Sequence, residues 1–347
     1  MKAAVLYEGG VLRYEESYPE PATGPRQVKI RVRCSGICGS DVPRVLNNAA
    51  HHYPVVLGHE FSGDIVEVGA DVSGVRIGSK AAGAPLLPCL ICADCMRGDY
   101  SLCGGYSFIG SREQGSFAEH VVLPAINAVV FDDAVSYEQG ALFEPATVAL
   151  HGLRRVCYVG GRDVAVLGGG TIGLFTMQWA KIFGAKSVTV FDVAEHRLVL
   201  AKKLGSDYTV NTSAIGLPAI LHPEAFDYVF EAAGQTETML QAFSLAAKKA
   251  SVCFIGTPTK ELTFSHKQLE LMHRKEFTLT GAWMSYSAPF PGDEWRLTSH
   301  YFGTGQLKFD AGMIFKTFPL CDAAEAFQLF KTPGAVGGKM LLTNSAT

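Results

Sequence analysis

The stretch from residue 163 to residue 192, DVAVLGGGTIGLFTMQWAKIFGAKSVTVFD, constrains the fold more than any other part of the sequence. A strand pattern is followed by a glycine turn, a helical pattern and a second strand pattern. Gly168, Gly170 and Gly173 match the spacing GxGxxG. The first glycine permits a tight turn, the second lets the backbone approach a pyrophosphate, and the third lets the helix pack on the strand. The stretch therefore predicts a βαβ unit that binds a dinucleotide.

The surroundings of the glycine turn support this interpretation over a turn without a ligand. The predicted helix begins near Thr171, and its N-terminus would bind the phosphates. Asp192 ends the second strand, 24 residues after Gly168. A carboxylate there accepts hydrogen bonds from a ribose 2′-hydroxyl and repels a 2′-phosphate, so NAD is favoured over NADP. Arg197 either softens this repulsion or is a solvated helix residue. The predicted cofactor-binding residues of this turn are Gly168, Gly170, Thr171, Ile172, Gly173, Asp192 and Arg197.

Periodicity divides the chain into a β-rich part and an α/β part. After residue 163, strand patterns alternate with helical ones, which indicates a parallel, doubly wound sheet. Short alternating segments broken by glycines fill residues 1–33 and 55–80, which is typical of a partly open barrel. We predict an α/β fold with a β-rich domain at 1–148 that contains a lobe at 85–105, a nucleotide-binding domain at 149–286, and a return to the first domain at 287–347.

Composition excludes several classes of protein. The chain has 347 residues, is 48% hydrophobic and has a formal charge of −3, which argues against binding to nucleic acid or to an anionic membrane surface. The sequence predicts neither a signal peptide nor a membrane helix, so we expect a cytoplasmic protein. Nine cysteines in a reducing compartment are better explained by metal than by disulfides.

Cysteines cluster in PLLPCLICADCMRGDYSLC. Cys89, Cys92, Cys95 and Cys103 are separated by two, two and seven residues, and four thiolates at such spacing can close a tetrahedral shell around one zinc. A shell without an open position predicts a structural metal. Spacing alone does not distinguish zinc from an iron–sulfur cluster, and incidental cysteines are the third alternative.

A second metal site is indicated between Cys34 and Glu60. Cys38 is followed 21 positions later by His59, and Glu60 comes next. A thiolate, an imidazole and a carboxylate are the ligands of a catalytic zinc, which keeps a position open for substrate. Glu144 precedes Pro145; by itself it is a candidate ligand, a surface carboxylate or a helix-start carboxylate.

Taken together, these motifs resemble those of the zinc-dependent medium-chain dehydrogenases, over essentially the whole chain. Within that family the chain is most similar to the polyol dehydrogenases, and in particular to those of phosphorylated polyols. The shared stretches are HYPVVLGHEFSG, PLLPC, FIGSREQGSFAEH and WMSYSAPFPGDEW. The resemblance implies a GroES-like catalytic domain and a Rossmann NAD-binding domain, with the active site in the cleft between them and two zinc ions per chain. It also implies a homodimer or homotetramer, commonly joined through the edge of the Rossmann sheet.

The resemblance further implies roles for single residues. Cys38, His59 and Glu144 would hold the catalytic zinc, with Glu60 alternately a ligand and a neighbour of the ligands. Ser40 would be the first hydroxyl of a proton path. Lys339 matches a basic position that contacts the cofactor pyrophosphate, unless it is an exposed strand lysine.

Two positions depart from the family pattern. Where many alcohol dehydrogenases carry a histidine that relays the proton, this chain has Pro43, so the exit path must use ribose hydroxyls, water, His51 or His52. Sorbitol dehydrogenases carry an arginine where this chain has Ser285, which argues against recognition of free sorbitol.

A phosphorylated polyol needs cations, and Arg44, Arg112, His51 and His52 are the candidates, unless they are plain surface residues. Phe117 and Tyr286 are the candidates for the walls of the substrate site. Alternatives are a dehydrogenase of free polyols or of threonine, and a non-catalytic NAD-binding zinc protein.

Overall fold

The computed structural model describes residues 1–213, 226–258, 260–332 and 334–344. The chain forms two compact units. Unit 1 consists of Met1–Glu144, Tyr286–Gly305 and Ala311–Thr347, and unit 2 of Pro145–Ser285 and Gln306–Asp310. The segment Gln306–Asp310, which we expected in the return to the first domain, therefore belongs to the nucleotide-binding part of the chain. No helix among the described residues has the length and apolar character needed to cross a membrane.

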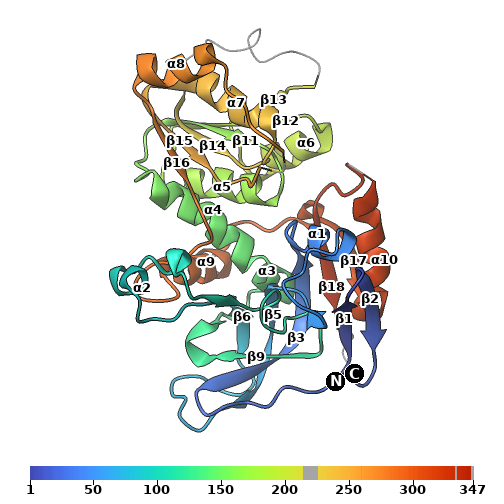
Figure 1. Ribbon diagram of the computed structural model, residues 1–347. Helices are drawn as coiled ribbons and strands as arrows, with labels where there is room; N and C mark the ends of the chain where they lie inside the picture. Colours follow the sequence, from blue (N-terminus) through green and yellow to red (C-terminus); the bar gives the residue numbers. More distant parts are fainter. Residues whose placement is uncertain (214–225, 259, 333, 345–347) are drawn as a thin grey trace. The chain divides into compact units, whose positions relative to one another are not determined.

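Unit 2 is built on a parallel sheet of six strands in the order β13-β12-β11-β14-β15-β16. The strands are β11 (Asp163–Leu167), β12 (Ser187–Asp192), β13 (Tyr208–Asn211), β14 (Phe226–Glu231), β15 (Ala246–Phe254) and β16 (Thr278–Gly281), and the helices are α4 (Phe143–Arg155), α5 (Thr171–Ile182), α6 (Glu195–Leu204), α7 (Thr236–Leu245) and α8 (His266–Lys275). Helices α5 and α6 pack together, as do α7 and α8, and Figure 1 shows the two pairs on opposite faces of the sheet. This confirms the predicted doubly wound sheet, whose strand order is that of dinucleotide-binding domains.

Unit 1 contains sheets of seven, three and two strands. Its strands are β1 (Ala3–Tyr7), β2 (Val11–Glu15), β3 (Gln27–Ile37), β4 (Val55–Val56), β5 (Glu60–Val68), β6 (Lys80–Gly83), β7 (Leu86–Leu87), β8 (Ser107–Phe108), β9 (His120–Pro124), β10 (Ala128–Val130), β17 (Ile314–Pro319) and β18 (Lys339–Thr343). Its helices are α1 (Asp41–Leu46), α2 (Ala93–Arg97), α3 (Tyr137–Ala141), α9 (Asp293–Gly303) and α10 (Ala323–Gln328). In the largest sheet, strand β3 pairs antiparallel with β5, β9 and β18, so the first and last thirds of the chain meet.

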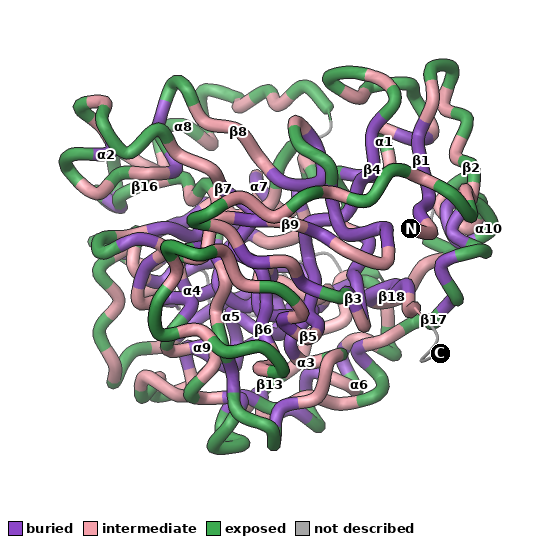
Figure 2. Tube along the Cα trace, turned by 90° about the horizontal axis from the view of Figure 1, so that it is seen from below, coloured by how far each residue is buried: buried purple, intermediate pink, exposed green. Residues whose placement is uncertain are grey.

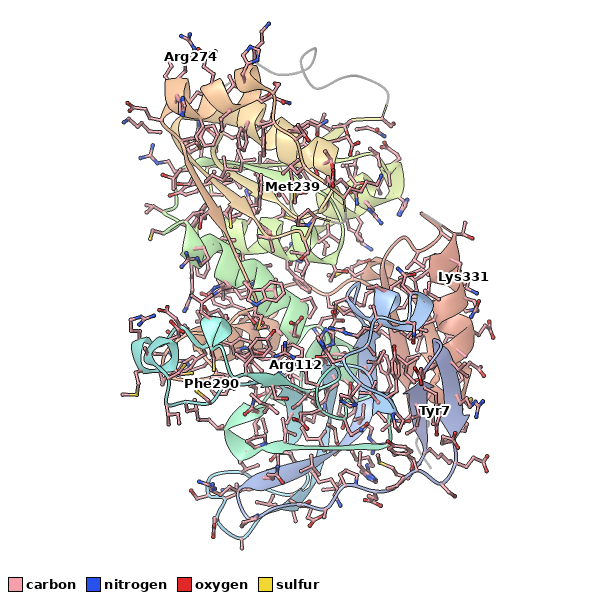
Figure 3. The ribbon with its side chains drawn as sticks, in the orientation of Figure 1. Tyr7, Arg112, Met239, Arg274, Phe290 and Lys331 are labelled. Atoms are coloured by element: carbon pink, nitrogen blue, oxygen red, sulfur yellow. The ribbon has the colours of Figure 1, made fainter. Side chains whose placement is uncertain are left out.

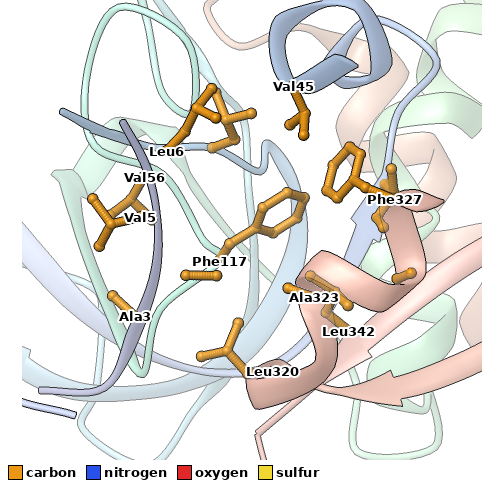
Figure 4. Close-up of a cluster of buried hydrophobic side chains, with 14 of the residues drawn as sticks. Ala3, Val5, Leu6, Val45, Val56, Phe117, Leu320, Ala323, Phe327 and Leu342 are labelled. Carbon is orange, nitrogen blue, oxygen red and sulfur yellow. The ribbon is translucent and has the colours of Figure 1, made fainter. Parts of the chain in front are cut away.

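Alternating apolar residues of the strands form the core of unit 1. Strand β3 buries Val28, Ile30 and Val32 on one face, as its period of two predicts. A second cluster collects β1, β4 and α10 around Phe117 and Phe327 (Figure 4). Figure 2 shows these strands buried, while the loops and the segment around α2 are largely exposed. The rigid strands hold the loops at their ends, where the candidate site lies.

Candidate active site

The predicted metal centre forms where β3 ends beside the start of β5. The antiparallel register pairs Gly36 with Glu60, which brings Cys38, just beyond β3, next to His59 and Glu60. One ligand atom from each of Cys38, His59 and Glu60 lies within 4.8 Å of the others. A Cβ atom on Gly36 would come within 2.3 Å of the Glu60 carboxylate, so glycine is needed there to make room for this side chain.

The electrostatics of this cluster suit a divalent cation. Burial raises the pKa of the Cys38 thiol to about 11, and Glu60 adds to the shift. Burial also raises the pKa of Glu144, to about 8. Nδ1 of His59 is buried and lacks a hydrogen-bond partner among the described residues. A thiol and a carboxyl group whose ionisation burial disfavours, beside an imidazole, are a donor set that a zinc ion can deprotonate and bind.

Glu144 lies in the first turn of α4, with Pro145 next to it at a position where a helix accepts proline. Among the causes of its pKa shift are charges on His59, Glu60 and Cys38, so the carboxyl belongs to the same electrostatic neighbourhood. Its role as the third ligand, in place of Glu60, stays a prediction.

Lys339 has a different partner from the one expected. Its ammonium donates to both carboxylate oxygens of Glu60, at 2.7 and 2.6 Å, and its side chain is only 8% exposed. Strand β18 runs antiparallel to β3 with Met340 opposite Ile37, which places Lys339 beside the cluster. This arrangement does not support the predicted contact with a cofactor pyrophosphate, because the ammonium is buried and already paired.

Asp41 joins the metal centre to Arg44. Its carboxylate is fully buried, and Oδ2 accepts a hydrogen bond from the backbone N–H of Cys38 at 3.1 Å. Oδ1 lies 3.6 Å from Nδ1 of His59 and accepts a hydrogen bond from Nη1 of Arg44 at 3.0 Å. Carboxylates in this position orient metal-ligating histidines. This role was not predicted from the sequence, in which Asp41 is only an acid three residues after Cys38.

The four predicted cations form one group in unit 1. Nε2 of His52 lies 3.1 Å from the backbone carbonyl oxygen of Arg112. The guanidinium group of Arg112, which is labelled in Figure 3, stacks over the ring of Tyr106. Burial lowers the pKa of His51, and the charges of Arg112, Arg44 and His52 lower it further. His51 is therefore within electrostatic reach of the other three residues, and the permanent positive charges of the group are the guanidinium groups of Arg44 and Arg112.

The residues expected to form the walls of the substrate site are core residues instead. Phe117 is fully buried and packs edge-on against Phe327. Tyr286 is 3% exposed, stacks on Phe290 and accepts a hydrogen bond from the backbone N–H of Leu86 at 2.9 Å. We therefore correct both assignments, because side chains closed off in this way present no surface to a substrate. Ser285 is also buried and accepts a hydrogen bond from Thr147.

The four cysteines of the lobe converge as predicted. Their sulfur atoms lie within 4.8 Å of one another, around α2. Backbone N–H groups of Ile91 and Cys92 hydrogen-bond Cys89 and lower its pKa to about 6, whereas burial raises the pKa of Cys95 to about 12. Backbone donors to sulfur favour the thiolate form that a metal ion requires.

The glycine turn connects β11 to α5, and Gly168 has the positive φ of 100° that the turn requires. A Cβ atom on Gly173 would come within 1.7 Å of the carbonyl oxygen of Gly168, so helix and strand approach as the motif predicts. Asp192 accepts hydrogen bonds from the backbone N–H groups of Gly169 and Ala194, at 2.6 and 2.8 Å. Arg197 lies 3.5 Å from the same carboxylate.

A cavity of about 510 Å³ opens at this turn, and Gly168, Gly170, Asp192 and Arg197 are among the residues that line it. The loop after β14 forms another of its walls. Glu231, which the sequence analysis missed, holds this loop by accepting hydrogen bonds from the N–H groups of Ala233 and Gly234 and from the Thr238 hydroxyl. Its place at the carboxyl end of a parallel strand was the available signal.

Comparison with known proteins places the chain in a family. Residues 24–133 match the model of the alcohol dehydrogenase GroES-like domain, and residues 171–299 match that of the zinc-binding dehydrogenases. The chain is 38% identical to galactitol 1-phosphate 5-dehydrogenase of Escherichia coli K12, over 89% of this chain and 91% of that one.

Solved structures agree with this assignment. The crystal structure of galactitol-1-phosphate dehydrogenase from Escherichia coli superposes with a TM-score of 0.92 at 36% identity, covering 99% of this chain and 100% of that one. A zinc-binding dehydrogenase from Sinorhizobium meliloti, bound to NADP, superposes with a TM-score of 0.88 at 31% identity, covering 99% of this chain and 98% of that one. The family favours zinc over an iron–sulfur cluster at the four cysteines. The chain therefore belongs to the zinc-binding dehydrogenases with a GroES-like domain, as an alcohol or polyol dehydrogenase whose cofactors are zinc and a nicotinamide dinucleotide.

Proposed function

We propose that the protein oxidises a secondary hydroxyl of a phosphorylated sugar alcohol to a ketone, with galactitol 1-phosphate as substrate, L-tagatose 6-phosphate as product and NAD as hydride acceptor. The observation that carries the proposal is the group of four basic side chains, Arg44, His51, His52 and Arg112, which Arg44 connects to the metal centre through Asp41. Guanidinium groups bind phosphate with two parallel hydrogen bonds, and a free polyol offers no charge for such a group.

Cys38 and His59, with Glu144 or Glu60 as the carboxylate, would hold the catalytic zinc. When bound, zinc lowers the pKa of a substrate hydroxyl as it lowers that of water. Oδ1 of Asp41 lies 3.6 Å from Nδ1 of His59, and with the metal bound this carboxylate would help to direct the other ring nitrogen to the metal. The ammonium group of Lys339 forms an ion pair with Glu60, so the Glu60 carboxylate has a counter-charge even when it does not bind the zinc.

Ser40 is the first acceptor of the substrate proton in this proposal. Its side chain is exposed, and its hydroxyl accepts a hydrogen bond from Arg44 at 3.0 Å, which leaves the hydroxyl proton free to point elsewhere. Pro43 cannot relay a proton. His51 and His52, both exposed, are the nearest candidates in sequence to pass it to solvent.

The nucleotide would bind in the cavity at the glycine turn of unit 2. Backbone N–H groups at the start of α5, around Thr171 and Ile172, would face the pyrophosphate, and Asp192 would accept hydrogen bonds from the adenosine ribose. When bound, the nicotinamide accepts a hydride from the substrate carbon.

The protein is further proposed to assemble as a homodimer or homotetramer. Strand β16 is an edge strand of its sheet; Leu279 within it is 38% exposed, and Trp283, two residues after its end, is 52% exposed. An apolar edge strand is a surface on which a second copy can continue the sheet. Light scattering coupled to size-exclusion chromatography gives the number of subunits, and a strictly monomeric enzyme would contradict the proposal.

The test of the function is a substrate panel. Appearance of NADH is followed with galactitol, sorbitol, xylitol, their 1-phosphates and threonine, all with zinc-loaded enzyme. We expect kcat/KM to be at least about a hundredfold higher for a phosphorylated hexitol than for its free form, which corresponds to two charge-assisted hydrogen bonds. Higher activity on a free polyol or on threonine would identify one of the alternative dehydrogenases. Binding of NAD without turnover of any of these alcohols would favour a non-catalytic protein.

A further inference from the structure

We infer that Arg44 is a positioning residue through which the phosphate of the substrate acts on the metal centre, so that the phosphate raises the rate of hydride transfer as well as the affinity. This inference rests on the proposed function, because it requires that the substrate carries a phosphate. It differs from that proposal in assigning the phosphate an effect on kcat.

The first observation is the position of Arg44 between two functional groups. It lies three and four residues after Asp41 and Ser40 on the short helix α1, which is the spacing at which helical side chains meet. Its Nη1 donates to the hydroxyl of Ser40 and to the carboxylate of Asp41, both at 3.0 Å. One nitrogen atom therefore contacts both the proposed proton acceptor and the carboxylate that lies 3.6 Å from Nδ1 of His59.

The second observation is the burial of Asp41. Its side chain is fully buried, and its cationic neighbours in the described part of the chain are Arg44 and, when protonated, His59. A buried carboxylate that loses its cationic partner is strongly destabilised. Asp41 also accepts a hydrogen bond from the backbone of Cys38. The position of Arg44 therefore affects two predicted zinc ligands through a single carboxylate.

The third observation is that half of the guanidinium remains available. Among the described residues, every hydrogen bond of Arg44 uses Nη1, which leaves Nε and Nη2 without a partner. These two nitrogens form the edge that binds phosphate with two parallel hydrogen bonds. The side chain of Arg44 is 16% exposed, so it is largely buried but still in contact with solvent.

The rigidity of the guanidinium connects these observations. Because the group is planar, a phosphate bound to Nε and Nη2 fixes the plane and therefore the direction of Nη1. The hydroxyl of Ser40 and the carboxylate of Asp41 are then held in one arrangement. Arg112 differs, since its Nη1 donates to the backbone carbonyl of Tyr106 and its guanidinium stacks over the ring of the same residue. In the described part of the chain, none of its hydrogen bonds goes to a residue of the metal centre. We therefore expect Arg112 to contribute to affinity alone.

The test separates the phosphate from the polyol. Zinc-loaded enzyme is assayed with galactitol 1-phosphate, and with galactitol in the presence and absence of phosphite dianion. For the wild type, saturating phosphite is expected to raise kcat with galactitol about tenfold or more, the contribution of one charge-assisted contact. In Arg112→Met the KM for galactitol 1-phosphate rises about tenfold and phosphite at higher concentration still activates.

In Arg44→Met we expect kcat with galactitol 1-phosphate to fall about tenfold or more and activation by phosphite to disappear. Arg44→Lys is the second variant, because lysine keeps the positive charge but lacks the planar guanidinium group that donates two parallel hydrogen bonds. Calorimetry should show that it still binds phosphite, while its kcat with galactitol does not respond. Arg76→Met, at an exposed arginine of unit 1, is the matched control and should behave like the wild type. The zinc content of each variant, measured by chelator titration, should equal that of the wild type.

Two results would overturn the inference while leaving the proposed function intact. One is a wild type that prefers the phosphorylated polyol but is unaffected or inhibited by phosphite with galactitol. The other is an Arg44→Met variant with a raised KM and an unchanged kcat. A wild type with equal kcat/KM for galactitol and galactitol 1-phosphate would instead overturn the proposed function itself, and this inference with it.

Discussion

The ammonium nitrogen of Lys339 lies 2.6 Å from Oε2 and 2.7 Å from Oε1 of Glu60, and both side chains are buried beside the metal centre. The two residues are 279 positions apart in the sequence. Charge on Glu60 therefore has a permanent partner, and Glu60 can stay next to Cys38 and His59 without binding the zinc. Burial also raises the pKa of Glu144 to about 8, and Glu144 as the carboxylate ligand of the zinc stays a prediction.

Lys339→Met is predicted to destabilise the protein strongly when zinc is removed. The substitution leaves the Glu60 carboxylate buried without its partner, at a cost of about 3–5 kcal/mol in the free energy of unfolding. With zinc bound the loss should be smaller, because the dication supplies the missing charge. Urea unfolding with and without a chelator measures both values. Equal losses in the two conditions would mean that Glu60 does not sense the metal.

Cys38→Ser and Cys95→Ser are predicted to remove different zinc ions with different effects. Cys38→Ser should lower the zinc content from two ions per chain to one and reduce kcat at least about a thousandfold, since the metal contributes several kcal/mol to catalysis. Cys95→Ser should remove the other ion and lower the melting temperature, because a structural zinc contributes directly to folding.

Metal analysis, steady-state kinetics and calorimetry distinguish the two cysteine variants. Cys321→Ser, at an exposed cysteine outside both clusters, is the control and should retain both ions. Full activity in Cys38→Ser would exclude this residue as a ligand of a catalytic metal.

Asp192→Ser is predicted to shift the cofactor preference from NAD toward NADP. The substitution removes the carboxylate that would bind the ribose hydroxyls and that lies 3.5 Å from Arg197. The guanidinium can then bind a 2′-phosphate, and the ratio of kcat/KM for NAD and NADP should change by about 10–100-fold. Absolute activity should fall with NAD, because the N–H groups of Gly169 and Ala194 lose their acceptor.

Glu195→Gln is the matched control for cofactor preference. It removes a carboxylate from the start of α6, where the side chain binds Asn211 and does not line the cavity. A similar change of preference in Glu195→Gln would show that general charge, and not the position of Asp192, decides between the cofactors.

Asp64 is predicted to make the stability of unit 1 depend on pH in the acid range. Burial alone would raise the pKa of Asp64, but hydrogen bonds from Tyr137, Arg33 and Arg31 outweigh it and lower the pKa below its usual value of 3.8. The carboxylate therefore stabilises the folded state above pH 3.8, and this contribution is lost as the pH falls through the lower folded-state value.

Asp64→Asn should accordingly lower the free energy of unfolding by about 1–3 kcal/mol at neutral pH. The difference from the wild type should disappear in strong acid, where Asp64 is protonated in both states. Urea unfolding at a series of pH values measures it. Asp71→Asn, at an exposed aspartate of unit 1, is the control. A difference that persists at the lowest pH would assign the effect to packing and not to charge.

Local patterns in the sequence were sufficient for those parts of the site whose residues are close together in the chain. The turn from Gly168 to Gly173 spans 6 positions and the cluster from Cys89 to Cys103 spans 15, so their spacing determines much of their geometry. The same holds for Cys38 and His59, which two neighbouring antiparallel strands bring together. The doubly wound sheet followed from the alternation of strand and helix patterns, and the structure confirms it.

Aromatic residues and long-range partners were not predictable in this way. Phe117 and Tyr286 are aromatic residues of the kind that often line substrate sites. Whether such a ring faces a cavity or the core depends on tertiary packing, which a sequence pattern does not specify. The contacts of Asp41 were missed because a buried acid and a surface acid look the same in a sequence.

The sequence by itself determined the family, the two kinds of unit, and the residue types that bind zinc and nucleotide, because each of these depends on short-range spacing. The tertiary structure alone decided that Lys339 pairs with Glu60 and that Arg44 reaches Asp41 beside His59. Strand β18 returns to β3 from the far end of the chain, and its register determines which side chain meets the metal centre. Such a register results from the packing of the whole sheet, and no local pattern specifies it.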